Sequence, residues 1–254
     1  MLDLIDSHCH LDFEVFDNER SAMIQKLTEV GINHLIIPAV NASGWQNLIQ
    51  LCQSHPNLHY ALGLHPMFLA EHHPDQLAIL KQHIKHNRPL AIGEIGLDFY
   101  NKETNKKLQA QFFQAQLMIA KEAQLPVLMH IRKTHDLVIN VLKKIPQTGG
   151  ICHAFNGTIR QAHSYIEMGF LLGFGGTLTY PNAPKIKHLA QTIPLESIVL
   201  ETDSPDMPTA SNKGGINSPF YLAEICQALA EIKGVNIERV AQQTSANVKK
   251  LFNL

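Results

Sequence analysis

Imidazole and carboxylate side chains recur at the ends of short apolar segments along this chain. The first segment, LIDSHCH, places His8 and His10 two residues apart and is followed by Asp12. Neutral imidazole nitrogens and carboxylate oxygens suit zinc, manganese, iron or nickel, whereas an all-oxygen site suits magnesium better. Later segments end at further residues of these two types, namely Glu94, His130, His153 and Asp203. If the fold brings these segment ends together, the pattern predicts a site for divalent metal ions.

The first segment also predicts which side chains face this site. Side chains of a β-strand alternate between its two faces. His8 and His10 therefore face the same way and Cys9 faces away, and Cys152 is turned away from His153 in the same manner. We expect both thiols to pack in the interior. A single histidine at a strand end is usually a structural hydrogen-bonding group, but the repetition of the pattern favours metal binding.

Short apolar runs alternate with helical patterns along the whole chain. Eight strand-like runs cover residues 4–8, 32–40, 58–66, 89–98, 126–131, 149–155, 169–176 and 197–205. Apolar spacing predicts helices near 20–30, 43–54, 75–87, 104–124, 134 onward, 158–168, 183–191, 218–232 and 236 onward. The clearest of them has one apolar stripe, formed by Leu108, Phe112, Ala115, Ile119 and Ala123.

Alternating strands and helices indicate an α/β fold with a parallel sheet. Eight units in 254 residues favour a closed (β/α)8 TIM barrel forming a single domain over residues 1–254, although an open doubly wound sheet also fits. No Gly-x-Gly-x-x-Gly turn follows a strand, which disfavours a dinucleotide-binding fold. Functional groups of such barrels lie at the C-terminal ends of the strands, where the predicted ligands fall.

Composition narrows the class of protein. Hydrophobic residues make up 45% and charged residues 17%, as in ordinary globular proteins. The formal net charge of -1 provides no global field to hold duplex DNA, so any attraction to nucleic acid must be local. The four cysteines form no CxxC pair, no run is long enough for a membrane span, and the start lacks signal-peptide features. We expect a cytoplasmic protein with reduced thiols, no membrane association and no obligate protein partner.

Motifs spread over the whole chain resemble those of a known family. They are DSHCHLD (6–12), GLHP (63–66), GEIGLDFY (93–100), LMHIRK (128–133), CHAFNGT (152–158) and LETDSP (200–205). In this order they resemble the TatD family of metal-dependent deoxyribonucleases, within the amidohydrolase superfamily. The resemblance implies a metal-dependent hydrolase whose ligands are His8, His10, Glu94, His130, His153 and Asp203.

The same resemblance suggests substrates. Family members hydrolyse DNA from 3′ ends, and some relatives deacylate D-aminoacyl-tRNA. One position departs from the pattern, because Ile216 precedes Asn217-Ser218-Pro219 where many nuclease members carry an arginine.

Six candidate ligands exceed what one tetrahedral catalytic ion needs and match two divalent ions sharing a bridge, for which Glu94 is the natural carboxylate. We expect zinc, manganese or magnesium. A water held between two ions loses a proton near neutral pH, so a metal-activated hydroxide would attack a phosphorus or a carbonyl carbon. Asp203 is expected to act as the base. His65 and Arg132 are expected to bind a substrate phosphate, although a salt bridge with Glu201 is an equal alternative for Arg132.

Several further residues near the predicted site have two possible roles each. Asp98 either orients a ligand or caps the following loop. The Lys102, Lys106 and Lys107 cluster is either solvated surface or a phosphate contact, and Gly175-Gly176 is either a phosphate-binding turn or simply a tight turn. The histidines outside the strands are expected to be solvated, namely His72, His73, His83 and His86.

Three functions are compatible with this pattern. The first is a phosphodiesterase that acts on DNA as a 3′ exonuclease. The second is a metal-dependent hydrolase of another ester or amide, such as a D-aminoacyl-tRNA deacylase. The third, a binding protein without catalysis, is disfavoured because the whole set of candidate ligands is present.

Overall fold

The computed structural model describes residues 2–254, in which eight strands are hydrogen-bonded in chain order, from β1 to β8. The strands are β1 Leu4–Asp6, β2 Ile32–Pro38, β3 Leu58–Leu62, β4 Ala91–Asp98, β5 Val127–Arg132, β6 Gly150–Cys152, β7 Phe170–Phe174 and β8 Ile198–Leu200. The helices are α1 Arg20–Leu27, α2 Trp45–Gln53, α3 Gln76–Asn87, α4 Lys106–Ala123, α5 His135–Lys144, α6 Ile159–Glu167, α7 Pro184–Thr192, α8 Leu222–Lys233 and α9 Ile237–Phe252. Short 3-10 turns connect them, among them η4 Pro66–Glu71, η5 Gly176–Thr179 and η8 Pro219–Tyr221.

Neighbouring strands pair in parallel, as in β1–β2, β3–β4, β4–β5, β5–β6 and β7–β8. The backbone just beyond the first strand returns to the last one, because Ser7 N donates to Leu200 O at 3.0 Å. The predicted parallel (β/α)8 barrel is therefore confirmed. The fold divides into two compact units, which are described in turn, and the single domain over residues 1–254 stays a prediction.

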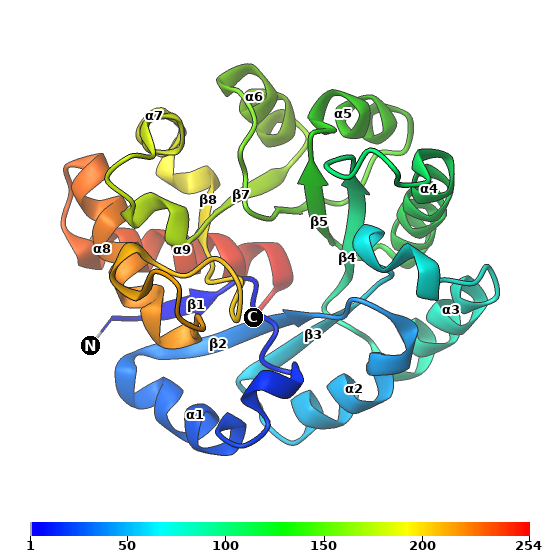
Figure 1. The fold of residues 1–254 in the computed structure, drawn as a ribbon, viewed down its shortest axis with the longest axis horizontal. Helices are drawn as coiled ribbons and strands as arrows, with labels where there is room; N and C mark the ends of the chain where they lie inside the picture. The colour runs from blue at the N-terminus through cyan, green and yellow to red at the C-terminus, as the bar shows by residue number, and fades with distance from the viewer. Residues whose placement is uncertain (1) are drawn as a thin grey trace. The chain divides into compact units, whose positions relative to one another are not determined.

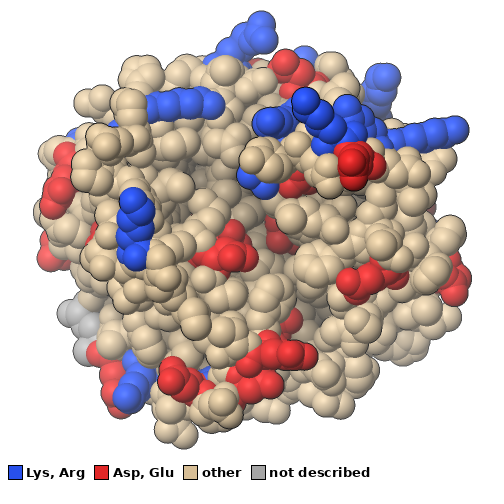
Figure 2. All heavy atoms as spheres, viewed as in Figure 1, with Lys and Arg blue, Asp and Glu red and all other residues tan. Residues whose placement is uncertain are grey.

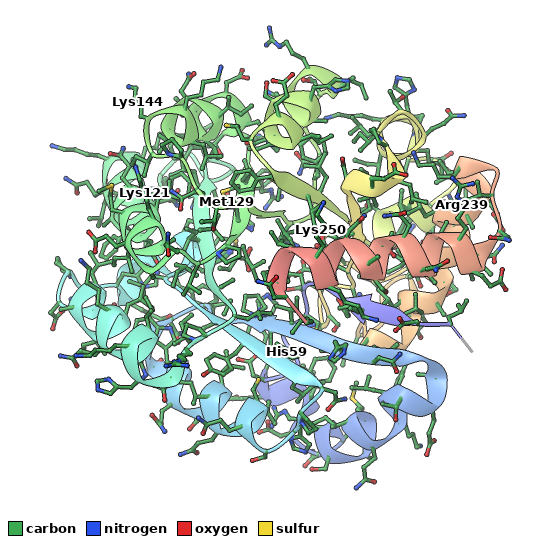
Figure 3. The ribbon with its side chains drawn as sticks, turned by 180° about the vertical axis from the view of Figure 1, so that it is seen from behind. His59, Lys121, Met129, Lys144, Arg239 and Lys250 are labelled. Atoms are coloured by element: carbon green, nitrogen blue, oxygen red, sulfur yellow. The ribbon has the colours of Figure 1, made fainter. Side chains whose placement is uncertain are left out.

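The first unit runs to Ile37 and adds Ala154–Ile159 and Leu172–Leu254. Its last helix, α9, lies along β1 and β8 (Figure 1) and buries Val240, Ala241 and Val248 there. Asn236 caps this helix by accepting from Arg239 N at 2.9 Å. Near the other end, Lys249 contacts Asp3 at 2.7 Å. Arg239 and Lys250 mark the two ends of α9 in Figure 3.

The second unit comprises Pro38–His153 and Arg160–Leu171. Helix α4 packs on β4 (Figure 1), and Asn105 caps it by accepting from Leu108 N at 3.1 Å. The predicted apolar stripe is only partly buried, because two glutamines, Gln109 and Gln116, share the buried face. Their amides hydrogen-bond the loop that follows β3, so they are polar residues with defined partners.

Two predicted strand ends differ from those observed. Glu94 was expected at the C-terminal end of the fourth strand, but it lies inside β4, which continues to Asp98 as the predicted run does, past a shift in register between Ile92 and Ile95. The first strand ends early, at Asp6, so that His8 and His10 lie beyond it. Within residues 2–254, no helix has the length and apolar character that crossing a membrane requires.

Candidate metal centre

Three predicted ligands of the first unit converge. His8 Nε2 lies 3.3 Å from His10 Nε2 and 3.6 Å from Asp203 Oδ1, and His10 Nε2 lies 3.7 Å from the same oxygen. Four ligands around a zinc ion at ordinary bond lengths are about 3.4 Å apart. The three atoms therefore have the spacing of ligands to one small divalent cation.

Backbone hydrogen bonds explain why these side chains meet although the strands end early. Beyond β1, Ser7 N donates to Leu200 O and Cys9 N to Ile36 O, at 3.0 and 3.1 Å. These bonds hold the segment beyond β1 against its neighbours, where the rings of His8 and His10 meet and Cys9 is fully buried. Asp203 N donates to His8 O at 2.9 Å, which holds the turn after β8 against the same segment.

Asp6 supports this arrangement from below. Its carboxylate accepts from Thr202 N at 3.0 Å, from Thr202 Oγ1 at 2.6 Å and from His8 N at 3.2 Å. Burial raises the pKa of Asp6 to about 7, although these hydrogen bonds oppose the shift. The carboxylate thereby ties the backbone of one predicted ligand, His8, to the residue before another, Asp203.

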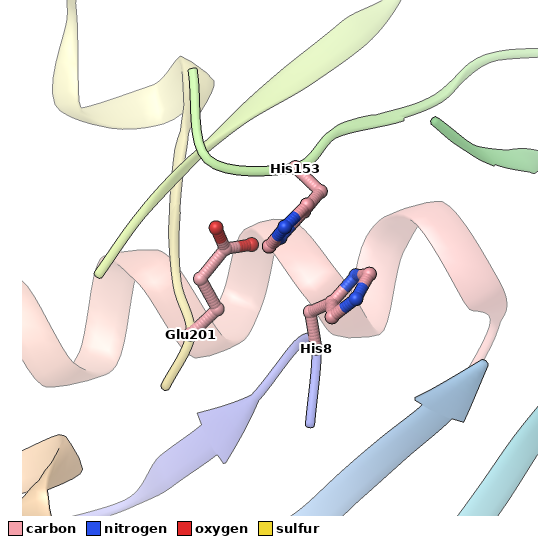
Figure 4. Close-up of side chains that lie close together, drawn as sticks. All are labelled: His8, His153 and Glu201. Atoms are coloured by element: carbon pink, nitrogen blue, oxygen red, sulfur yellow. The ribbon is translucent and has the colours of Figure 1, made fainter. Parts of the chain in front are cut away.

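Glu201 is a possible ligand that the sequence analysis did not select. It follows β8, is 1% exposed, and accepts from Ala154 N through Oε1 at 2.6 Å. One of its oxygens lies within 4.8 Å of a His8 ring nitrogen. Figure 4 draws both side chains, together with that of His153. The available signal was its position two residues before Asp203, on the same face.

Gly173 makes room for this carboxylate. A Cβ at Gly173 in β7 would lie 2.2 Å from Glu201 Oε2, closer than any real contact. Gly176, expected either to bind phosphate or to form a tight turn, has a similar constraint, because its Cβ would lie 2.4 Å from Met207 O. Close packing of the chain accounts for both glycines.

The second unit holds another cluster, centred on Glu94. Its Oε1 lies 3.2 Å from His65 Nε2 and 3.1 Å from His130 Nδ1. All three side chains are largely buried, and Glu94 is 2% exposed. A cation could bind at this cluster, because a carboxylate oxygen and imidazole nitrogens lie close together there.

The two imidazoles beside Glu94 differ in character. His65 Nδ1 accepts from Met67 N at 3.2 Å, so in the neutral ring the proton is on Nε2, which donates to Glu94. This tautomer supports a role in orienting Glu94 or holding substrate. The ring is fixed further because His72 Nε2 donates to His65 O at 2.8 Å. The expectation that His72 is solvated was wrong, since it is 6% exposed and holds this loop.

His130 is positioned by a second carboxylate. Its Nε2 lies 3.0 Å from Asp98 Oδ2, while its Nδ1 faces Glu94. Burial opposes a charge on His130, but the hydrogen bonds to Asp98 and Glu94 raise the pKa of the imidazole above its ordinary value. A carboxylate behind a ligating histidine fixes its ring and increases its basicity. His130 is thus placed to ligate through Nδ1.

Asp98 contacts a predicted ligand and also caps the following loop. Oδ2 faces His130, and Oδ1 accepts from Tyr100 N at 2.8 Å, which caps the following loop. Burial would raise its pKa, but the hydrogen bonds from His130 and from Tyr100 N, with the nearby cations, lower the pKa below that of a free carboxyl.

His153, another predicted ligand, follows β6 and is 6% exposed. The centre of its ring lies 6.2 Å from the centre of the His130 ring, on which it stacks. Cys152 beside it is fully buried.

Arg132 has a different carboxylate neighbour from the one expected. Its Nη1 lies 4.0 Å from Asp98 Oδ2, and its guanidinium carbon lies 3.7 Å from the centre of the Tyr100 ring. The register of β4 and β5 pairs Arg132 with Asp98, and the alternative of a salt bridge with Glu201 stays a prediction. Lys102, Lys106 and Lys107 are exposed, and Lys106 Nζ lies 5.2 Å from the centre of the Phe99 ring.

Comparison with known proteins shows the family to which this fold belongs. The family described as TatD related DNase matches residues 5–253. The uncharacterized metal-dependent hydrolase YjjV of Escherichia coli K12 is 36% identical over 255 residues, which cover 98% of each chain. Its crystal structure aligns with a TM-score of 0.95 at 35% identity, over 100% of this chain and 99% of that one. The chain belongs to the TatD family of metal-dependent hydrolases.

A further relative in the family has a described activity. The TatD protein of Erwinia tasmaniensis, a 3′-5′ ssDNA/RNA exonuclease, is 31% identical over 261 residues, which cover 99% of this chain and 100% of that one. The barrel, the family and the dependence on metal predicted from the sequence are thus confirmed. Buried imidazoles and carboxylates at ligand spacing fit divalent cations that accept nitrogen and oxygen.

Proposed function

We propose that this protein hydrolyses phosphodiester bonds of DNA from the 3′ end, using two divalent ions. The observation that carries the proposal is the spacing of His8, His10 and Asp203, which fits one cation without rearrangement. The likeness to the Erwinia exonuclease supports the choice of bond. The position of Arg132, beside Asp98 and on an exposed ring, supports a phosphate-bearing substrate.

In this proposal the two clusters form one centre. Its ligands are His8, His10, Glu94, His130, His153 and Asp203. Glu94 serves both ions, and Asp98 fixes His130 from behind. A set with four imidazoles favours zinc or manganese over magnesium. Glu201 is held ready beside His8 by the amide of Ala154.

Bound ions would supply an activated water near neutral pH and would stabilise the charge that develops on phosphate. Asp203 accepts the proton of the attacking water as its oxygen bonds to phosphorus. The bond from phosphorus to the 3′ oxygen of the preceding nucleotide then breaks, and Asp203 returns the proton to that oxygen. The products are a 5′-nucleotide and a strand one nucleotide shorter. Arg132 pairs with a phosphate oxygen, and His65 Nε2–H holds Glu94 in place.

One observation favours the second candidate, the hydrolysis of another ester such as D-aminoacyl-tRNA. Ile216 occupies the position at which many family nucleases carry an arginine, and it is 61% exposed. An apolar side chain there removes a contact to phosphate and leaves a surface suited to an apolar group of the substrate.

A substrate panel separates the two candidates. Metal-loaded protein is incubated with end-labelled single-stranded DNA, RNA, an aryl phosphodiester and D-aminoacyl-tRNA, with Asp203→Asn as the inactive control. We expect stepwise shortening of DNA from its 3′ end by the wild-type protein. Rapid deacylation of D-aminoacyl-tRNA without cleavage of any phosphodiester would establish the second candidate instead.

We also place the protein in the cytoplasm. All four cysteines are buried thiols, which suits a compartment where thiols stay reduced.

A further inference from the structure

Tyr100 is a solvent-exposed aromatic residue whose ring contacts two cationic side chains. It follows β4 and is 56% exposed. The guanidinium carbon of Arg132 lies 3.7 Å from the ring centre, and Lys133 Nζ lies 4.7 Å from it. Figure 2 shows Lys and Arg side chains gathered where α4 and β5 lie in the same view of Figure 1.

The backbone holds these three residues in a defined arrangement. Tyr100 N donates to Asp98 Oδ1 at 2.8 Å, and Phe99 N donates to Arg132 O at 3.1 Å. Lys133 has a φ of 60°, a left-handed conformation that is uncommon for a residue with a side chain. The segments just beyond β4 and β5 therefore present the ring and both cations, and the left-handed conformation of Lys133 points to a functional constraint.

Two cations share the Tyr100 ring, and the carboxylate that pairs with one of them has a second partner. Arg132 and Lys133 approach the same ring, while the carboxylate beside them, Asp98, lies 4.0 Å from Arg132 and is engaged by His130. The ring attracts each cation through its face, yet this attraction leaves two positive charges together. An anion from the substrate would offset the repulsion between them.

Asp98 also links this surface to the candidate metal centre. The same oxygen, Oδ2, lies 3.0 Å from His130 Nε2 and 4.0 Å from Arg132 Nη1. The Asp98 carboxylate thus lies between Arg132 and His130, a predicted metal ligand. A group held at Arg132 belongs to the part of the substrate next to the reacting bond.

We infer that Tyr100, Arg132 and Lys133 form a subsite for the nucleotide adjoining the cleaved bond. This inference rests on the proposed function and specifies which residues bind the DNA strand. The two cations bind phosphate oxygens, and the nucleobase packs against the part of the Tyr100 ring that stays exposed. An aromatic ring beside cations is the usual means of holding single strands without reading sequence, and a guanidinium stacked on a ring keeps its edge for phosphate.

Binding is measured in EDTA, so that catalysis plays no part, by anisotropy of a labelled tetrathymidylate and of an abasic strand of equal length. Tyr100→Ala should weaken binding of the tetrathymidylate about 5- to 100-fold and affect the abasic strand much less. Tyr100→Phe should bind both strands as the wild type does. Arg132→Gln and Lys133→Gln should each weaken the binding of both strands to a similar degree. Each should also reduce the slope of log affinity against log salt concentration by about one.

Lys121→Ala is the matched control, since Lys121 is an exposed cation near the other end of α4, labelled in Figure 3. An equal loss for both strands in Tyr100→Ala would mean that the ring only supports the cations, which overturns the base contact. Wild-type binding in Tyr100→Ala, or no binding of either strand by the wild type, would overturn the subsite. Ring-dependent binding without any DNA cleavage by metal-loaded protein would refute the proposed function and leave the subsite standing.

Discussion

The two carboxylate oxygens of Asp98 hold different parts of the site. Oδ2 contacts His130 Nε2, whereas Oδ1 accepts from Tyr100 N and orders the loop after β4. In the proposed centre its effect on a metal would therefore be indirect, because it fixes the ring of a proposed ligand, His130. The side chain is 6% exposed, so water cannot readily replace it.

Asp98→Asn keeps the size of this side chain but removes its charge. We expect the affinity for metal to fall about 10- to 100-fold, because the imidazole of His130 loses the partner that orients it and increases its basicity. Competition with a chromogenic chelator measures the change. Asp75→Asn, at an exposed position before α3, is the control and should leave the affinity unchanged. Unaltered affinity in Asp98→Asn would assign Asp98 to the loop alone.

At the scale of elements, α4 positions the loop that carries His65. Gln116 accepts from Leu64 N at 2.7 Å and donates to Leu64 O at 3.2 Å, while Gln109 donates to Pro66 O at 2.9 Å. The helix therefore holds the backbone on both sides of His65. Apolar periodicity predicted the helix, but it could not predict these two amides, because their partners lie far away in the sequence.

Gln116→Met preserves volume and removes both hydrogen bonds. Two buried backbone groups of Leu64 then lack partners, and the free energy of unfolding should fall by about 2 to 4 kcal/mol. Urea denaturation measures it, with Gln114→Met on the exposed face of α4 as the matched control. Equal stability of the two variants would show that water or a local shift satisfies Leu64.

The contact between Asp3 and α9 gives a prediction that depends on pH. The hydrogen bond from Lys249, followed by that from Asn33, lowers the pKa of Asp3 below 3.8. The ionised pair therefore stabilises the fold above that pH, and the contribution is lost as the pH falls through the lowered pKa. Because both side chains are partly exposed, Asp3→Asn should cost no more than about 1 kcal/mol near neutral pH.

Denaturation midpoints of the wild type and of Asp3→Asn should converge in acid. Lys249→Gln should show the same profile, since it removes the partner of the same pair. A difference between Asp3→Asn and the wild type that persists at low pH would mean that the Asp3 charge is not its source.

At the scale of the whole molecule, the order of the elements was predictable and the side-chain partners were not. Eight apolar runs became eight strands, because each run is bounded by a helical pattern or a turn. Residue type and strand alternation were enough to predict that His8, His10 and Asp203 meet. The partner of Arg132, the burial of His72 and the proximity of Glu201 to His8 depend on register between distant segments, which local patterns do not encode.

The net charge of the whole molecule determines how strongly it attracts a polyanion from a distance. With a formal net charge of -1, the protein has no long-range field to attract a polyanion, and Figure 2 shows side chains of both signs on the visible face. Binding of a strand must then depend on local groups such as Arg132 and Lys133. Its dependence on salt should accordingly be shallow compared with that of a basic nuclease.

The most direct measurement is the metal content of Glu94→Gln and Asp203→Asn beside their activity, after loading with zinc or manganese. If Glu94 serves two ions in one centre, the wild type binds two ions per chain and Glu94→Gln loses both, together with turnover. Asp203→Asn should keep much of its metal while the rate falls about 10²- to 10⁴-fold, as for the loss of a general base. Near-normal metal content in Glu94→Gln, or a nearly active Asp203→Asn, would contradict the shared centre and the assigned base respectively.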